Sequence, residues 1–184
     1  MLKRLFSVSA IILITTLSYG QEVKKESETV KTKMEVFTSK TGSITKFVDN
    51  KLPNLSASYG AAETRVRKIT NGAATAYFYQ ITKEGKYSNS VASIEYSDLM
   101  ELLKAVKVLK GEVINDIAAN SDYRENKFVT VDGFQVGYYV SKGKASWYIK
   151  LEKQGSDNTL FIDNGDTFET ALTDAKRKID ELKR

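Results

Sequence analysis

The chain has 184 residues, a net charge of +5, and neither cysteine nor histidine. These two absences exclude disulfide bonds, Ser-His-Asp and Cys-His catalysis, and zinc sites built from His or Cys. The small net charge does not argue for nucleic-acid binding, which needs a clustered basic face. We therefore expect no cofactor and no metal site, and any chemistry would rest on carboxylates, Lys, Tyr, Ser or Thr.

The first twenty residues have the pattern of a cleavable secretory signal peptide. Lys3 and Arg4 supply a positive segment, an uncharged stretch runs from Leu5 to Leu17, and Ser18 and Gly20 are small residues that suit signal peptidase. We expect cleavage after Gly20 and export to the periplasm or the extracellular medium. The alternative is an uncleaved anchor, but the uncharged stretch is shorter than the about 20 apolar residues that span a bilayer. We therefore expect no stable membrane span after cleavage.

A polar leader and two short strands are predicted next. Residues 21–33 are polar and charged, and we interpret them as a leader in front of a single domain, residues 34–184. Alternation of apolar and polar residues predicts strands at residues 34–38 and 43–48. Pro53 is the only proline in the chain, and we expect a loop from there to Ala62.

The first half of the predicted domain continues as three strands and a helix, at residues 63–70, 74–83, 87–95 and 98–110. Asn71-Gly72 is a strong signal for a tight hairpin turn. Apolar residues at helical spacing predict the helix, with Ser97 or Asp98 as its cap and Gly111 as its end.

The second half repeats this order after residues 112–125, to which we assign no element. Its predicted strands and helix lie at residues 127–131, 134–140, 145–152, 159–162 and 167–183. Alternation is sharpest in the second and third of these strands, whose inward residues are the predicted core: Phe134, Val136, Tyr138, Val140, Ala145, Trp147, Ile149 and Leu151.

These elements predict an α+β fold, with antiparallel meander sheets and two amphipathic helices packed on them. Each half is a meander of strands followed by a helix. This order is compatible with a duplicated β-β-β-β-α unit and equally with two independent copies of a common arrangement.

Three segments carry a resemblance to a known group of proteins. They are Ile94–Leu109, Phe134–Tyr139 and the closing ALTDAKRKIDEL. Together they resemble uncharacterised exported β-rich proteins of Gram-negative bacteria, a domain of unknown function. The resemblance covers much of the second half and implies no activity, cofactor or site residue.

Two short motifs match catalytic or metal-binding patterns, and we interpret both as structural. S-x-x-K, S-D-N and K-T-G all occur, as in penicillin-binding proteins, but K-T-G directly precedes S-x-x-K here instead of following far behind it. Asp163-Asn164-Gly165-Asp166 offers oxygen ligands for calcium but lacks the order of an EF-hand. We expect a strand-to-helix turn there, with Asp166 as the helix cap.

The best candidates for a binding surface are three aromatic residues that alternate with the core positions. Tyr139, Tyr148 and Phe78 point away from the predicted core, and aromatic rings on an outward sheet face can stack on sugars or anchor a protein. The alternative is that a helix covers that face as well.

These observations favour a non-catalytic binding or interaction module over an enzyme. Its partner would be an unknown protein or glycan. The alternatives are a carboxylate-based hydrolase acting on cell-wall or environmental glycans, which needs two acids about 5–10 Å apart, and a carrier of a lipid or small ligand in an apolar cavity.

Overall fold

The computed structural model describes residues 31–153, 155 and 157–184, so the predicted signal peptide and most of the predicted leader lie outside the described part. Within it, the chain forms two antiparallel four-stranded sheets and three helices. The predicted α+β class is confirmed. None of the helices in the described ranges is long and apolar enough to cross a membrane.

Sheet A is a meander in the order β1-β2-β3-β4. Its strands are β1 (Thr45–Ala57), β2 (Gly60–Asn71), β3 (Ala74–Lys83) and β4 (Ser90–Glu95). Asn71 pairs with Ala74, so the hairpin turn consists of Gly72 and Ala73 rather than Asn71 and Gly72. Gly72 supplies the positive φ, 61°, that this turn needs.

The prediction of a loop from Pro53 to Ala62 is wrong, because β1 and β2 occupy most of this segment. Strand β1 continues through Pro53 with an irregularity between Leu52 and Leu55, and β2 begins at Gly60. β1 is the edge strand of sheet A. Proline is tolerated at a bulge of an edge strand because no ladder hydrogen bond needs its missing N–H.

Sheet B is a second meander, β5-β6-β7-β8. Its strands are β5 (Arg124–Val129), β6 (Gln135–Ser141), β7 (Lys144–Lys150) and β8 (Thr159–Ile162). Seven of the eight residues of the predicted core are buried, and Ala145 packs against them in a partly buried position.

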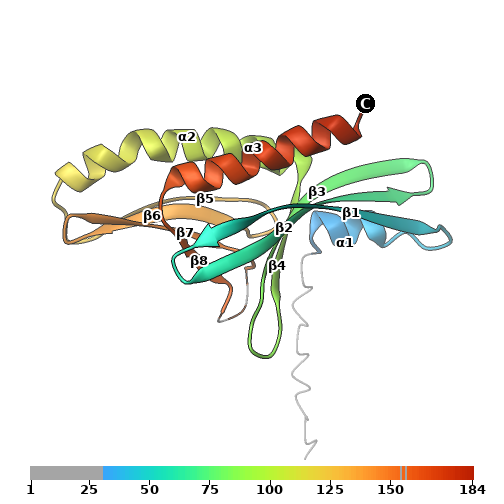
Figure 1. The fold of residues 1–184 in the computed structure, drawn as a ribbon, viewed down its shortest axis with the longest axis horizontal. Helices are drawn as coiled ribbons and strands as arrows, with labels where there is room; N and C mark the ends of the chain where they lie inside the picture. The colour runs from blue at the N-terminus through green and yellow to red at the C-terminus, as the bar shows by residue number, and fades with distance from the viewer. Residues whose placement is uncertain (1–30, 154, 156) are drawn as a thin grey trace, which may run out of the picture. The chain divides into compact units, whose positions relative to one another are not determined.

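Two long helices, α2 (Tyr96–Ala118) and α3 (Gly165–Leu182), lie side by side over one face of the two sheets (Figure 1). Each half of the described chain is therefore four strands followed by a helix. Helix α2 does not end at Gly111, because a glycine costs a helix only about 1 kcal/mol and Val113 and Ile117, beyond the glycine, pack against the core. The caps also differ from those predicted: Glu95 is the N-cap of α2, and Asn164 is the N-cap of α3.

Helix α1 (Lys33–Thr38) replaces the strand that we predicted from Met34 to Thr38. Thr32 and Glu35 form a capping box at its start, which a short alternating segment concealed. The helix lies on the side of sheet A away from α2 and α3 (Figure 1). Asn71 donates a hydrogen bond to the Phe37 carbonyl at 2.9 Å.

Strand β8 runs across one end of sheet A and joins the two sheets. The Ser58 amide, just after β1, donates to the Phe161 carbonyl at 2.8 Å. At the end of β3, Lys83 donates to the Thr159 carbonyl at 3.2 Å. The sheets therefore share backbone contacts as well as the helices that cover them.

Candidate binding surface

Each sheet has an outer face, which points away from α2 and α3. The strand register of sheet A aligns Asp49, Arg67 and Phe78 across β1, β2 and β3 on this face. Their neighbours along the strands, such as Val66 and Tyr79, point into the core. The outer face is where we predicted a binding surface.

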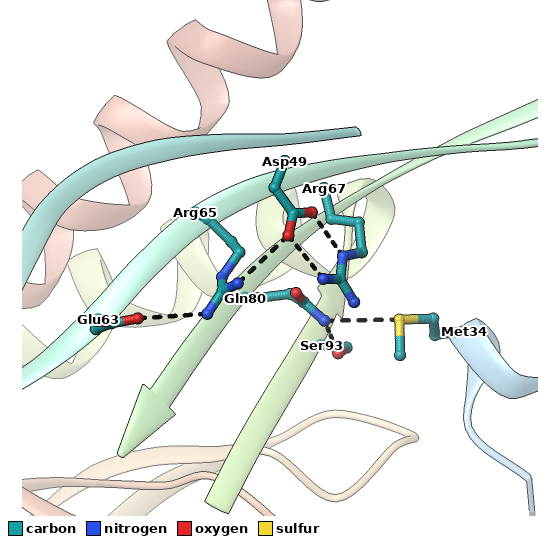
Figure 2. Close-up of polar contacts among 7 residues, drawn as sticks. All are labelled: Met34, Asp49, Glu63, Arg65, Arg67, Gln80 and Ser93. Carbon is teal, nitrogen blue, oxygen red and sulfur yellow. Dashed lines mark hydrogen bonds and ion pairs between the residues drawn. The ribbon is translucent and has the colours of Figure 1, made fainter. Parts of the chain in front are cut away.

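Phe78 does lie on the outer face but is not available to a partner. Its side chain is only 1% exposed, which contradicts the expected outward-facing contact. The reason is α1, which covers this part of the sheet. Gln80, the next outward residue of β3, donates to Ser93 at 2.8 Å and to the Met34 sulfur of α1 at 3.7 Å (Figure 2).

Tyr139 and Tyr148 share the outer face of sheet B, as predicted from their alternation with the core. Tyr148 is only 8% exposed, and its hydroxyl donates to the Glu125 carboxylate at 2.5 Å. Burial, together with this hydrogen bond, raises the pKa of Tyr148 above its ordinary value. Tyr139 stacks on exposed Tyr123 with 6.0 Å between ring centroids. Of the three predicted residues, only Tyr139 is therefore partly exposed, and Phe78 lies on the other sheet.

Sequence reasoning missed a group of charged residues on the outer face of sheet A, which we call the arginine ladder: Asp49, Glu63, Arg65 and Arg67. Arg67 binds Asp49 through two parallel hydrogen bonds, each of 2.7 Å (Figure 2). Arg65 donates to the same carboxylate at 3.3 Å and to Glu63 at 3.5 Å. Strand pairing places Asp49 opposite Arg67, and this register cannot be read from the sequence.

The hydrogen bonds of the ladder shift the pKa values of Asp49 and Arg67 toward their ionised forms. Hydrogen bonds from Arg67, together with the two positive charges, lower the pKa of Asp49 below its ordinary value. The hydrogen bond to Asp49 in turn raises the pKa of Arg67. The Arg67 guanidinium also lies 5.6 Å from the centre of the Phe47 ring, within the range of a cation–π contact. Phe47 is thus held in place on the outer face.

The open side of β1 is the most unusual part of this surface. We call residues Thr45–Leu52 the β1 edge, because they pair with β2 on one side and with no described strand on the other. Phe47 is 50% exposed and Val48 is 55% exposed, and Ile44 just before the strand is 79% exposed. Because neighbouring strand residues point to opposite faces, the edge presents apolar surface on both faces of the sheet.

The positive charge of the described chain is concentrated in the segment that contains this edge. Residues 31–83 contain nine basic and three acidic residues, whereas residues 84–184 contain fifteen basic and seventeen acidic residues. The small net charge of the whole chain hid this difference. Counting charges separately for these two segments would have revealed it from the sequence alone.

A second polar cluster holds α2 against sheet B. Asp116 accepts hydrogen bonds from Asn126 at 2.6 Å and from Tyr138 at 2.5 Å, and it pairs with Arg124. The hydrogen bond from Tyr138 lowers the pKa of Asp116, and burial raises the pKa of Tyr138 to about 12. The carboxylate is fully engaged by its own chain, so we interpret the cluster as structural.

Two shallow hollows lie along α3. The first is lined by acidic residues of α3, but Lys110 pairs with Asp166 and Glu169, and Arg177 pairs with Asp174. The second lies between the bulged part of β1 and α3 and has a volume of about 230 Å³. In the described ranges, no three acidic residues are placed to hold a metal ion.

Comparison with known proteins does not identify this surface. The chain matches no model of a known protein family, no curated protein and no solved structure.

Proposed function

We propose that this protein is an exported binding module, which recognises a partner without catalysing a reaction on it. We further propose that the partner binds at the β1 edge. The observation that supports this most directly is the exposure of Phe47 and Val48 on opposite faces of a strand that is paired on one side only. Proteins usually shorten, charge or cover such edges because they bind other chains.

The geometry favours this function over the two alternatives. A glycan hydrolase needs two cooperating carboxylates, whereas the acidic residues beside α3 are paired with Lys110 and Arg177. A carrier needs a pocket of about 300–1,000 Å³, whereas the hollow between β1 and α3 is smaller and includes polar Thr64 and Asp174 in its lining. The signal-peptide pattern supports a partner in the periplasm or outside the cell.

The test compares partner capture by three forms of the full chain, each purified after its natural N-terminal processing. They are the wild type, the edge variant Phe47→Ser with Val48→Ser, and the control variant Ile114→Ser with Val131→Ser. The control changes two other exposed apolar residues outside sheet A. Each is immobilised and exposed to the envelope and medium of its own cells.

We expect a partner that the wild type and the control variant retain and the edge variant loses. A partner that all three retain equally would place recognition elsewhere and contradict the proposed site. Turnover of a captured glycan by the wild type would contradict the non-catalytic role.

A further inference from the structure

The β1 edge has the dimensions and the chemistry of a site for one more strand. The bulge between Leu52 and Leu55 and the missing N–H of Pro53 limit the open stretch to Thr45–Leu52. Eight residues in a strand extend over about 26 Å. We propose that an extended, acidic polypeptide segment of the partner adds to β1 as a fifth strand of sheet A. This inference rests on the proposed function and names the partner's chemistry.

The unpaired backbone groups of the open edge favour a polypeptide over another polymer. Along an edge strand, unpaired N–H and C=O groups alternate at the spacing of a strand, and an extended chain offers the matching alternation. Phe47 and Val48 add an apolar contact on each face next to these groups. A polyanion without a peptide backbone would use the charge but leave the backbone groups unpaired.

The positive charges along the β1 edge favour an acidic segment of the partner. Lys46 and Lys51 lie near the two ends of the open stretch, and both are exposed. The strand register places Lys51 beside Arg65 on the outer face, and Lys46 lies on the opposite face. Asp49, the acidic residue between them, is already neutralised by Arg67 and Arg65. Each end of the edge therefore offers a positive charge to an incoming strand.

The same charges disfavour a second copy of this chain as the occupant. Each β1 edge carries Lys46 and Lys51, and its one acidic residue, Asp49, is already held by Arg67 and Arg65. Two β1 edges paired with each other would therefore bring four lysines together without a free carboxylate to balance them. Lysine on an edge strand is also a common means of preventing self-association. The charges of the edge therefore favour a chain of opposite charge over a second copy of this chain.

These positions define a sequence pattern in the partner. An acidic residue faces Lys46, apolar residues face Phe47 and Val48, two unrestricted residues face Asp49 and Asn50, and an acidic residue faces Lys51. Peptides with the order Glu-Val-Val-Thr-Thr-Glu, or the reverse order for the opposite strand direction, therefore serve as probes, capped and flanked by glycine and serine.

The experiment measures binding of both peptides to the full chain by calorimetry and follows backbone amide exchange by NMR. We expect alternate amides of the β1 edge to slow by about tenfold when the free peptide is tenfold above its dissociation constant. Lys46→Glu with Lys51→Glu should weaken binding by about tenfold, because two attractions become two repulsions. Lys104→Glu with Lys107→Glu, two exposed lysines of α2, makes the same charge change away from the edge and should leave binding unchanged.

Two control peptides separate strand addition from plain charge attraction. In one, alternate backbone nitrogens are methylated, and it should not bind. In the other, lysine replaces both glutamates, and it should bind only to the double glutamate variant. Equal binding of the methylated peptide would overturn strand addition in favour of a charged polymer, and equal binding of the lysine peptide would overturn the acidic preference.

The outcomes also separate this inference from the proposed function. If neither glutamate peptide binds while the captured partner still depends on Phe47 and Val48, the edge is a binding site but its occupant is not an acidic strand. If, in addition, the edge variant captures the partner as well as the wild type does, the proposed binding site is wrong too.

Discussion

A single carboxylate, Asp49, organises the outer face of sheet A by holding two arginines. Its folded-state pKa is lowered, chiefly by the hydrogen bonds from Arg67. The ionised form therefore stabilises the fold fully at pH values above the unfolded pKa of about 3.9. This contribution is lost as the pH falls through the lower folded-state pKa.

We expect Asp49→Asn to lower the free energy of unfolding by about 1 kcal/mol at pH 7 and by much less near pH 2. Urea denaturation followed by Trp147 fluorescence at the two pH values measures this difference. Glu63→Gln is the matched control, because its contact with Arg65 is longer and more exposed. An equal loss at both pH values would show that the effect of Asp49 is not electrostatic.

The burial of Phe78 makes a second prediction at this scale. Phe78→Ala should lower the free energy of unfolding by about 3–5 kcal/mol, as for other buried aromatic residues. Tyr139→Ala loses mainly its stacking on Tyr123 and should cost about 1 kcal/mol. A small effect of Phe78→Ala in urea denaturation would mean that α1 leaves it accessible and would restore it as a surface contact.

At the scale of elements, two helical glycines have opposite roles. A Cβ atom on Gly165, at the start of α3, would lie 2.7 Å from Lys110 Cγ and 2.9 Å from Trp147 Cη2. A Cβ atom on Gly111, within α2, would meet no atom within 4 Å. The first glycine permits close packing of α3 against sheet B, whereas the second only lowers helix propensity.

We therefore expect Gly165→Ala to lower the free energy of unfolding by about 1–3 kcal/mol through overpacking, and Gly111→Ala to raise it by about 1 kcal/mol. Chemical denaturation of the two variants beside the wild type provides the measurement. A gain of stability in both variants would contradict the close packing at Gly165, and a loss in both would contradict the open space beside Gly111.

The elements that were predictable from the sequence are those in which local pattern and tertiary packing agree. Strands β3 and β8 begin and end as predicted, because their flanking turns and their alternation coincide. Helix α1 was missed because the alternation of residues 34–38 concealed the local capping box of Thr32 and Glu35. The first part of β1 was predicted, but its continuation through Pro53 was not, because the edge position that accommodates this proline depends on tertiary pairing. The arginine ladder depends on register, which long-range pairing determines.

At the scale of the whole molecule, we expect the two sheets to unfold as one unit. Helix α2 contacts strands of both sheets, and so does α3, and the buried residues form one core cluster. The class and the order of strands and helices were predictable because each sheet is a meander of neighbours in sequence. How the second sheet lies across the end of the first was not, since it depends on contacts such as Ser58 with Phe161.

Cooperative unfolding is testable with a natural probe, because Trp147 in sheet B is the only tryptophan. We expect its fluorescence and the far-ultraviolet circular dichroism to report the same urea midpoint. Amide exchange of Tyr79 in sheet A and Tyr138 in sheet B should give the same free energy of opening. Two separate midpoints would show that the sheets are independent units.

The packing of α3 on β1 has a consequence for synthesis of the protein. Tyr77 donates to the carbonyl of Leu182, 105 residues further along the chain, and α3 covers β1 and β2. As the chain emerges from its N-terminus, sheet A can pair its strands long before α3 emerges. The apolar inner side of β1 and β2 then stays uncovered until residues 165–182 have emerged. A premature stop codon before Gly165 would therefore yield a chain recognised by chaperones and proteases rather than a smaller working protein.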